Sequence, residues 1–157
     1  MRRLLACFSL VSIALAPGAA TASKPAIKLV AQTFVERVSI DVNGRQRRIL
    51  VQPQELGRGD RLVFIVRYRN EGSAPVSGFA VTNPVPPALQ VDMTQPDMQV
   101  SVDHGRRWGR LDSLSVSTPL GGTRRATPAD VTHIRWNVPQ PVRPGQEGRI
   151  SYRATVK

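Results

Sequence analysis

Cysteine is nearly absent from this chain of 157 residues: the only one is Cys7, in an apolar stretch close to the N-terminus. Beyond it no thiol is available for a disulfide scaffold, a cysteine-based metal site or a thiol nucleophile. Histidine is almost as scarce, since His104 and His133 are the only two, and Asp103 is the only carboxylate directly beside either. We therefore expect no metal centre and no cofactor.

Catalytic motifs are missing as well. The chain contains no Gly-x-Ser-x-Gly elbow, no His-Glu-x-x-His pair and no phosphate-cradling glycine loop. A glycosidase needs two carboxyl groups a few ångströms apart. The acids in the middle of the chain, two of them close to arginines, fit solvated loops better: Asp92, Asp97, Asp103 and Asp112. The sequence predicts a protein that is not an enzyme.

The N-terminus has the form of an export signal. A basic start, Met1-Arg2-Arg3, precedes the apolar run Leu4–Ala16, and Ala20-Thr21-Ala22 offers a small-x-small cleavage site. The apolar run of about 13 residues is shorter than the roughly 20 that cross a bilayer. We predict a cleaved signal peptide over residues 1–22, no transmembrane segment after cleavage, and export to the periplasm, cell surface or surroundings of a bacterium.

Acidic residues and lysine are both scarce relative to arginine. The formal net charge is +11, and removing Arg2 and Arg3 with the signal peptide leaves +9; only three of the basic residues are lysines. A basic exported protein is drawn to anionic envelope components such as lipopolysaccharide and acidic glycans, or to another envelope protein. Export argues against intracellular nucleic acid as a partner. A solvated arginine-rich surface without a dedicated partner remains the alternative.

No stretch of the chain keeps a 3.6-residue apolar period, whereas alternation with a period of two is frequent. In the clearest case Leu62, Phe64, Val66 and Tyr68 fall on one face, while Arg61, Arg67 and Arg69 point the other way, which is typical of a half-buried antiparallel strand. Further strands are predicted at 27–34 (an edge strand), 38–42 and 48–51 (a hairpin with a type I′ turn at Asn43-Gly44), 78–82, 134–138 and 149–156.

These patterns predict an all-β protein. Seven or eight short strands, with a proline-rich crossover at 83–87, fit an immunoglobulin-like antiparallel β-sandwich better than a closed barrel. Residues 23–157 are enough for one such domain. The segment Thr118–Asp130, rich in Gly, Pro, Thr and Arg, is predicted to be a mobile loop.

Two groups of residues are candidate sites. If the outer faces of two strands lie side by side, their arginines form a surface that could bind anions: Arg61, Arg67, Arg69, Arg149 and Arg153. The second group has the Ser-x-Asp-x-Gly-x-x-Trp form of an Asp-box: Ser101, Asp103, Gly105 and Trp108. There the aspartate accepts hydrogen bonds from turn amides and glycine takes a positive φ, so the predicted role is structural. The alternative is a carbohydrate-active protein or other hydrolase, with Trp108 as a sugar platform and Arg106 as a charge.

Several turn and strand residues occur in the order seen in one known family: Gly59-Asp60, Asn70-x-Gly72, Ala74-Pro75, Phe79 to Thr82, Asn83-Pro84, Trp136, Pro144-Gly145 and Arg149 to Val156. In this order, over roughly Arg48 to Lys157, the chain resembles the bacterial conserved-repeat family, an Ig-like domain of unknown function in exported and cell-surface proteins. The chain departs from the family at Asn83, where the family usually has aspartate, and in having room for a single copy. The resemblance implies a structural or adhesive module without catalytic residues. A pilin or adhesin subunit is a further alternative, which would have an open sheet edge for a donor strand.

Overall fold

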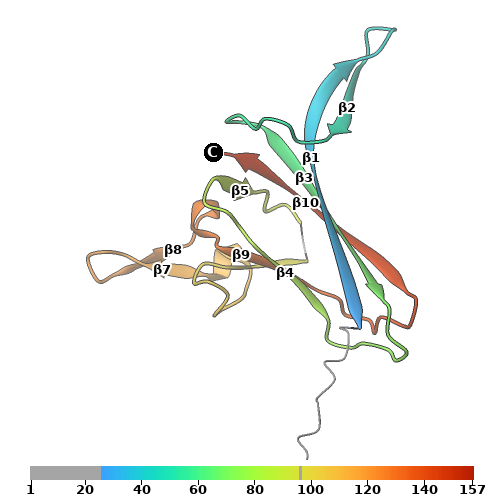
Figure 1. The fold of residues 1–157 in the computed structure, drawn as a ribbon. Coiled ribbons are helices and arrows are strands. Elements are labelled where there is room, and N and C mark those ends of the chain that lie inside the picture. The colour runs from blue at the N-terminus through green and yellow to red at the C-terminus, as the bar shows by residue number, and fades with distance from the viewer. Residues whose placement is uncertain (1–25, 96) are drawn as a thin grey trace, which may run out of the picture.

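The computed structural model describes residues 26–95 and 97–157; the predicted signal peptide and Cys7 lie outside these ranges. The described residues form ten strands and two short 3-10 turns, and all strand pairs are antiparallel (Figure 1). The all-β prediction is confirmed, although the strand number exceeds the predicted seven to eight. In this part of the chain no helix is long and apolar enough to span a membrane.

The larger sheet has five strands in the order β2-β1-β3-β10-β5. Their bounds are β1 Ile27–Ile40, β2 Gln46–Val51, β3 Arg61–Asn70, β5 Leu89–Val91 and β10 Glu147–Val156. The central strand β3 follows the predicted alternation in part: Leu62 and Val66 are buried and Arg67 is exposed, but Val63, on the same side as the arginines, is buried as well. The hairpin of β1 and β2 extends beyond the rest of the molecule (Figure 1).

A second sheet of three strands has the order β4-β9-β6. Its strands are β4 Ala80–Pro84, β6 Met98–Ser101 and β9 His133–Asn137. After β4 the proline run carries the chain across to β5 in the larger sheet, so the predicted crossover is confirmed. Pro84 itself still pairs with His133, which is permitted because β4 is an edge strand.

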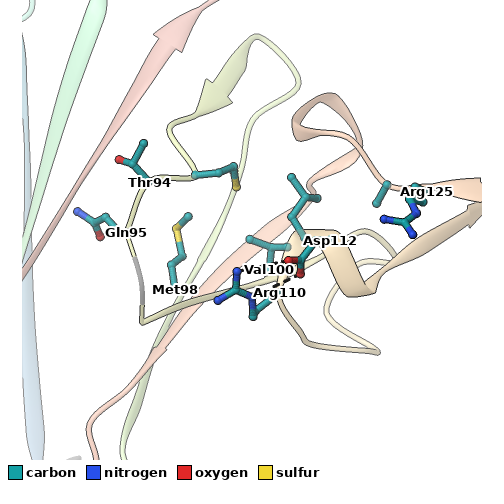
Figure 2. Close-up of a pocket in the computed structure, with 10 residues that line it drawn as sticks. Thr94, Gln95, Met98, Val100, Arg110, Asp112 and Arg125 are labelled. Atoms are coloured by element: carbon teal, nitrogen blue, oxygen red, sulfur yellow. Dashed lines mark hydrogen bonds and ion pairs between the residues drawn. The ribbon is translucent and has the colours of Figure 1, made fainter.

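A hollow of about 590 Å³ lies beside β6 and the connections on either side of it (Figure 2). Met93, Met98 and Val100 provide apolar side chains, and Arg110 is paired with Asp112 at 3.3 Å. The other lining residues are Thr94, Gln95, Leu111, Arg125 and Ala126. The hollow can take an apolar group, and its one carboxylate is already held in an ion pair.

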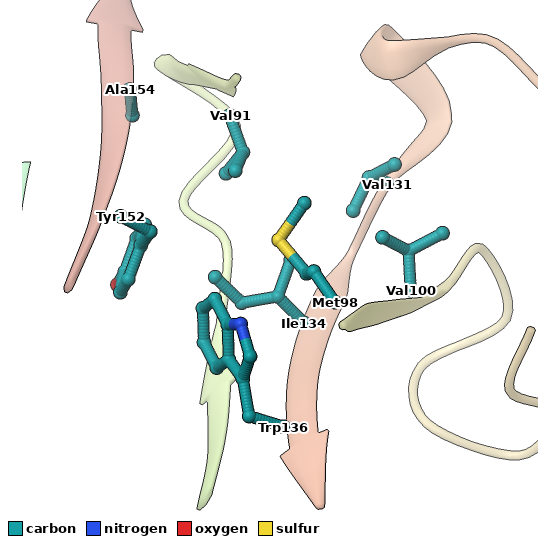
Figure 3. Packing of buried hydrophobic residues seen from close by; sticks show 8 residues of the cluster. All are labelled: Val91, Met98, Val100, Val131, Ile134, Trp136, Tyr152 and Ala154. Carbon is teal, nitrogen blue, oxygen red and sulfur yellow. The ribbon is translucent and has the colours of Figure 1, made fainter. Parts of the chain in front are cut away.

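The hydrophobic core lies between the two sheets and draws side chains from both (Figure 3). From the larger sheet come Val91, Tyr152 and Ala154; from the smaller sheet and its flanks come Met98, Val100, Val131, Ile134 and Trp136. The Tyr152 ring stacks on Phe64 with centroids 4.7 Å apart and lies 5.1 Å from Trp136. Trp136 is 6% exposed and forms part of this core.

The predicted turn between the first two strands is wrong in type. A type I′ turn needs positive φ at both Asn43 and Gly44, but among the described non-glycine residues only His104 has a positive φ. The connection is instead closed by Asp41, whose Oδ1 accepts hydrogen bonds from the amides of Asn43 and Arg45, each at 2.9 Å. Gly44 alone takes the left-handed conformation, with φ 75°.

Two further segments differ from the sequence-based expectation. The predicted strands at 27–34 and 38–42 form one continuous strand, β1, which ends at Ile40. It is continuous because β3 pairs with residues 27–36 and β2 with residues 35–40, so that the two ladders overlap. Thr118–Asp130 is not simply a loop: it contains β8 (Thr123–Arg125), which pairs with β7 (Ser115–Ser117), and the 3-10 turn Pro128–Asp130. An ion pair between Arg124 and Asp130, at 2.7 Å, ties these parts together.

Candidate functional site

The five predicted arginines lie on one face of the larger sheet. Arg67 of β3 stands directly opposite Arg149 of β10 in the ladder. Arg61, Arg69 and Arg153 lie on the same side, because each is an even number of residues away along its own strand: six, two and four. The opposite face carries Leu62, Phe64, Tyr152 and Ala154 toward the core. All five arginines are exposed. We call Arg61, Arg67, Arg69, Arg149 and Arg153 the outer arginine face.

One carboxylate, Glu36 of β1, compensates part of this charge. It lies 3.9 Å from Arg61 and 3.5 Å from Arg153, and it also contacts Arg48 of β2 at 3.2 Å. The Glu36 side chain is 8% exposed, so it sits beneath the three guanidinium groups. No local sequence pattern marks Glu36, because the three arginines that surround it come from three other strands.

The other three arginines divide into one paired and two unpaired residues. Arg69 contacts Glu147 at 2.8 Å, an exposed pair that contributes little stability. Within residues 26–95 and 97–157, Arg67 and Arg149 make no ion pair and no side-chain hydrogen bond. Side chains directly opposite in an antiparallel ladder have Cβ atoms about 5 Å apart, and like charges there repel. Arg67 and Arg149 are therefore the part of the face best placed to hold an anion.

The Asp-box residues form a locked turn after β6. Ser101 is fully buried; its Oγ donates a hydrogen bond to Asp103 Oδ1 at 2.8 Å and accepts one from the Gly105 amide at 2.8 Å. Asp103 also accepts from the backbone amide and the Nε of Arg107, each at 2.9 Å. Gly105 has φ 85°, and the Trp108 ring lies against it. These contacts brace the turn.

His104 also takes a left-handed conformation, with φ 59°, which no sequence pattern predicted. Its amide donates a hydrogen bond to Thr132 Oγ1 at 3.1 Å, and its ring centroid lies 6.3 Å from that of His133. The two histidines thus meet in space. Even so, the described residues contain no group of three or more His, Cys, Asp and Glu side chains that could hold a metal ion.

The surroundings of Trp108 and Asp103 bear on the carbohydrate alternative. The Arg135 guanidinium covers the Trp108 ring at 4.4 Å from its centroid, and Gln99 Oε1 holds that guanidinium at 2.7 Å. The ring is half-buried and not a free sugar platform. Asp103 is the only carboxylate lining the adjacent hollow of about 380 Å³, so the second acid that a glycosidase needs does not line it.

The hydrogen bonds to the carboxylates of Asp103 and Asp60 predict how the stability of the fold depends on pH. Hydrogen bonds from the Arg107 amide, the Arg107 side chain and Ser101 hold the pKa of Asp103 well below its usual range. Bonds from Arg37 and the Gly57 amide lower the pKa of Asp60 to about 2. Since the folded-state pKa values are depressed, both groups stabilise the fold above the ordinary carboxyl pKa of about 4, and this contribution disappears as the pH falls toward 2.

Thermal unfolding between pH 7 and pH 2 should therefore show a melting temperature that falls steeply below about pH 4. Asp103→Asn is expected to melt lower than the wild type at pH 7 and to lose less on acidification. As a control for acidification in general, Asp97→Asn replaces an exposed carboxylate for which no hydrogen bond is seen within the described residues. A pH profile of Asp103→Asn parallel to that of the wild type would contradict the bracing role.

In the comparison with known proteins, no family model, no curated protein and no solved structure matches the chain. The resemblance to the conserved-repeat family therefore remains a prediction that depends on the order of turn and strand residues.

Proposed function

We propose that the protein is an exported, non-catalytic module of the bacterial cell envelope, with an immunoglobulin-like fold and a structural or adhesive role. Its outer arginine face binds an anionic envelope component such as lipopolysaccharide or an acidic glycan. The observation that carries the proposal is the cross-strand pair Arg67 and Arg149, which lacks a compensating carboxylate among the described residues.

The chemistry of arginine supports this partner class. A guanidinium presents its N–H donors as a planar fork that matches phosphate, sulfate and carboxylate groups. An anion between Arg67 and Arg149 would replace a like-charge repulsion with charge-assisted hydrogen bonds from both strands. Arg61, Arg153 and Arg48 share the single carboxylate of Glu36, so they extend the positive potential along the sheet.

The proposal is tested by the binding of heparin, as a soluble polyanion, and of vesicles containing lipopolysaccharide, to the chain that begins at Ser23. The variant Arg67→Gln/Arg149→Gln is expected to lose at least tenfold in affinity at low salt, and its affinity should fall less steeply as salt is added.

A matched control is Arg106→Gln/Arg143→Gln, which removes the same charge from two exposed arginines outside the outer arginine face. This control should keep most of the affinity. Equal losses in the two double variants would show that binding follows net charge alone, and binding that is indifferent to salt would remove the electrostatic account altogether.

A further inference from the structure

We infer that the N-terminal half of β1 is a docking edge for a second copy of this chain. On one side β1 pairs with β3 from Ile27 to Glu36. On its other side β2 pairs only from Val35 onward, since Val51, the last residue of β2, stands opposite Val35. In the described part of the chain no strand pairs with the other side of Ile27–Phe34, which we call the free edge.

The free edge lacks the features by which sheets avoid unwanted pairing. Over its eight residues Lys28 is the only charge, and it contains no proline or glycine. Residues 28–32 are all exposed, with Leu29 at 51% and Val30 at 47% on opposite faces. The outer edge strand β2, in contrast, carries Arg47 and Arg48, and it ends two residues before Pro53. Natural sheets usually protect edges with charge, proline or shortness, so an unprotected edge of this length indicates a partner strand.

The residues of the free edge are complementary to themselves in an antiparallel pair. With a twofold axis through Val30, Lys28 of one copy lies opposite Gln32 of the other, and Leu29 lies opposite Ala31. No two like charges are opposed. The pair would continue the larger sheet from one copy into the next, in the position that β2 occupies farther along β1.

The structure also favours this register over those in which the twofold axis is shifted along β1. A shift of the axis to Ala31 would put Ile27 opposite Val35, which is already paired with Val51. A shift to Leu29 would leave more of the free edge unpaired. An axis between two residues would turn the inner face of one copy toward the outer face of the other, because side chains alternate with a period of two.

The positive charge of the molecule opposes this association but does not prevent it. Arg67 stands opposite Val30 in the ladder, so the two copies of Arg67 would be separated by three strand spacings, about 14 Å. At physiological ionic strength the screening length is about 8 Å, so added salt weakens this repulsion. Self-association should therefore strengthen with salt, in contrast to the binding of an anion.

Sedimentation velocity over a range of concentrations, at low and high salt, tests the inference on the chain that begins at Ser23. We expect a monomer–dimer equilibrium whose dissociation constant falls as salt rises. Val30→Lys places two positive charges across the axis and should weaken the dimer at least tenfold. Val38→Lys is the matched control, because Val38 is 64% exposed on the same strand and face but stands beside β2.

A second measurement makes the test independent of how Val30→Lys folds. Hydrogen exchange of the wild type should show that outward-pointing amides of Ile27–Phe34 gain protection as the protein concentration rises. The inference fails if the protein is monomeric under all these conditions, if the two lysine variants behave alike, or if the edge amides are already protected at high dilution. It also fails if an extended segment of a different protein pairs with this edge while the chain itself does not associate.

Discussion

Asn70→Asp is expected to lower the free energy of unfolding by about 3 kcal/mol or more. Asn70 ends β3 and is fully buried. Its Nδ2 donates hydrogen bonds to the carbonyl oxygens of Ala74 and Val142, each at 2.8 Å, and its Oδ1 accepts one from the Gly72 amide at 2.9 Å. Aspartate has the same shape but no N–H, so a buried negative charge would face two carbonyl oxygens.

Urea denaturation of the purified variant measures this effect. Asn43→Asp makes the same chemical change at an exposed turn position and should alter the free energy of unfolding by no more than about 0.5 kcal/mol. If the two variants are equally stable, the hydrogen bonds of Asn70 do not hold the 70–75 turn to the segment around Val142 as described.

Glu36→Gln is expected to change stability and ligand binding in opposite directions. The substitution removes the one carboxylate shared by Arg48, Arg61 and Arg153. Stability should fall by about 1 kcal/mol, a modest value because the three arginine side chains are more than half exposed. Binding to heparin should become several-fold tighter, because three more guanidinium groups become available to the polyanion.

Glu147→Gln is the matched control for this prediction. It makes the same charge change on the same face, but its carboxylate contacts Arg69 alone and is 65% exposed. We expect almost no loss of stability and a smaller gain in heparin affinity, measured by the same denaturation and binding assays. Weaker heparin binding by Glu36→Gln would contradict the role assigned to the outer arginine face.

The strands β3, β9 and β10 could be predicted from the sequence because each is half-buried, and a half-buried strand displays its two faces as alternating residue types. Trp136 and Tyr152 lie on the buried side of such patterns, and both are in the core. The Asn70-x-Gly72 turn could also be predicted from the sequence. The asparagine side chain accepts a hydrogen bond from the amide two residues ahead, which is a local interaction.

Features that depend on contacts between distant residues could not be predicted in this way. The grouping of Glu36 with Arg153 joins residues from β1 and β10 across β3. The free edge of β1 exists because β2 is shorter than β1, and no local pattern reports the relative length of two strands. The hairpin β7–β8 has almost no buried residues, so its strands carry no alternation that could distinguish them from a loop.

The most direct measurement is an NMR titration with a short sulfated oligosaccharide, followed on the arginine side-chain Nε–Hε signals. The signals of Arg67 and Arg149 should shift most and reach saturation together, and both shifts should disappear as salt is raised. Larger shifts at exposed arginines outside the outer arginine face, such as Arg106 or Arg143, or small uniform shifts over all arginines, would contradict a dedicated anion site on this sheet.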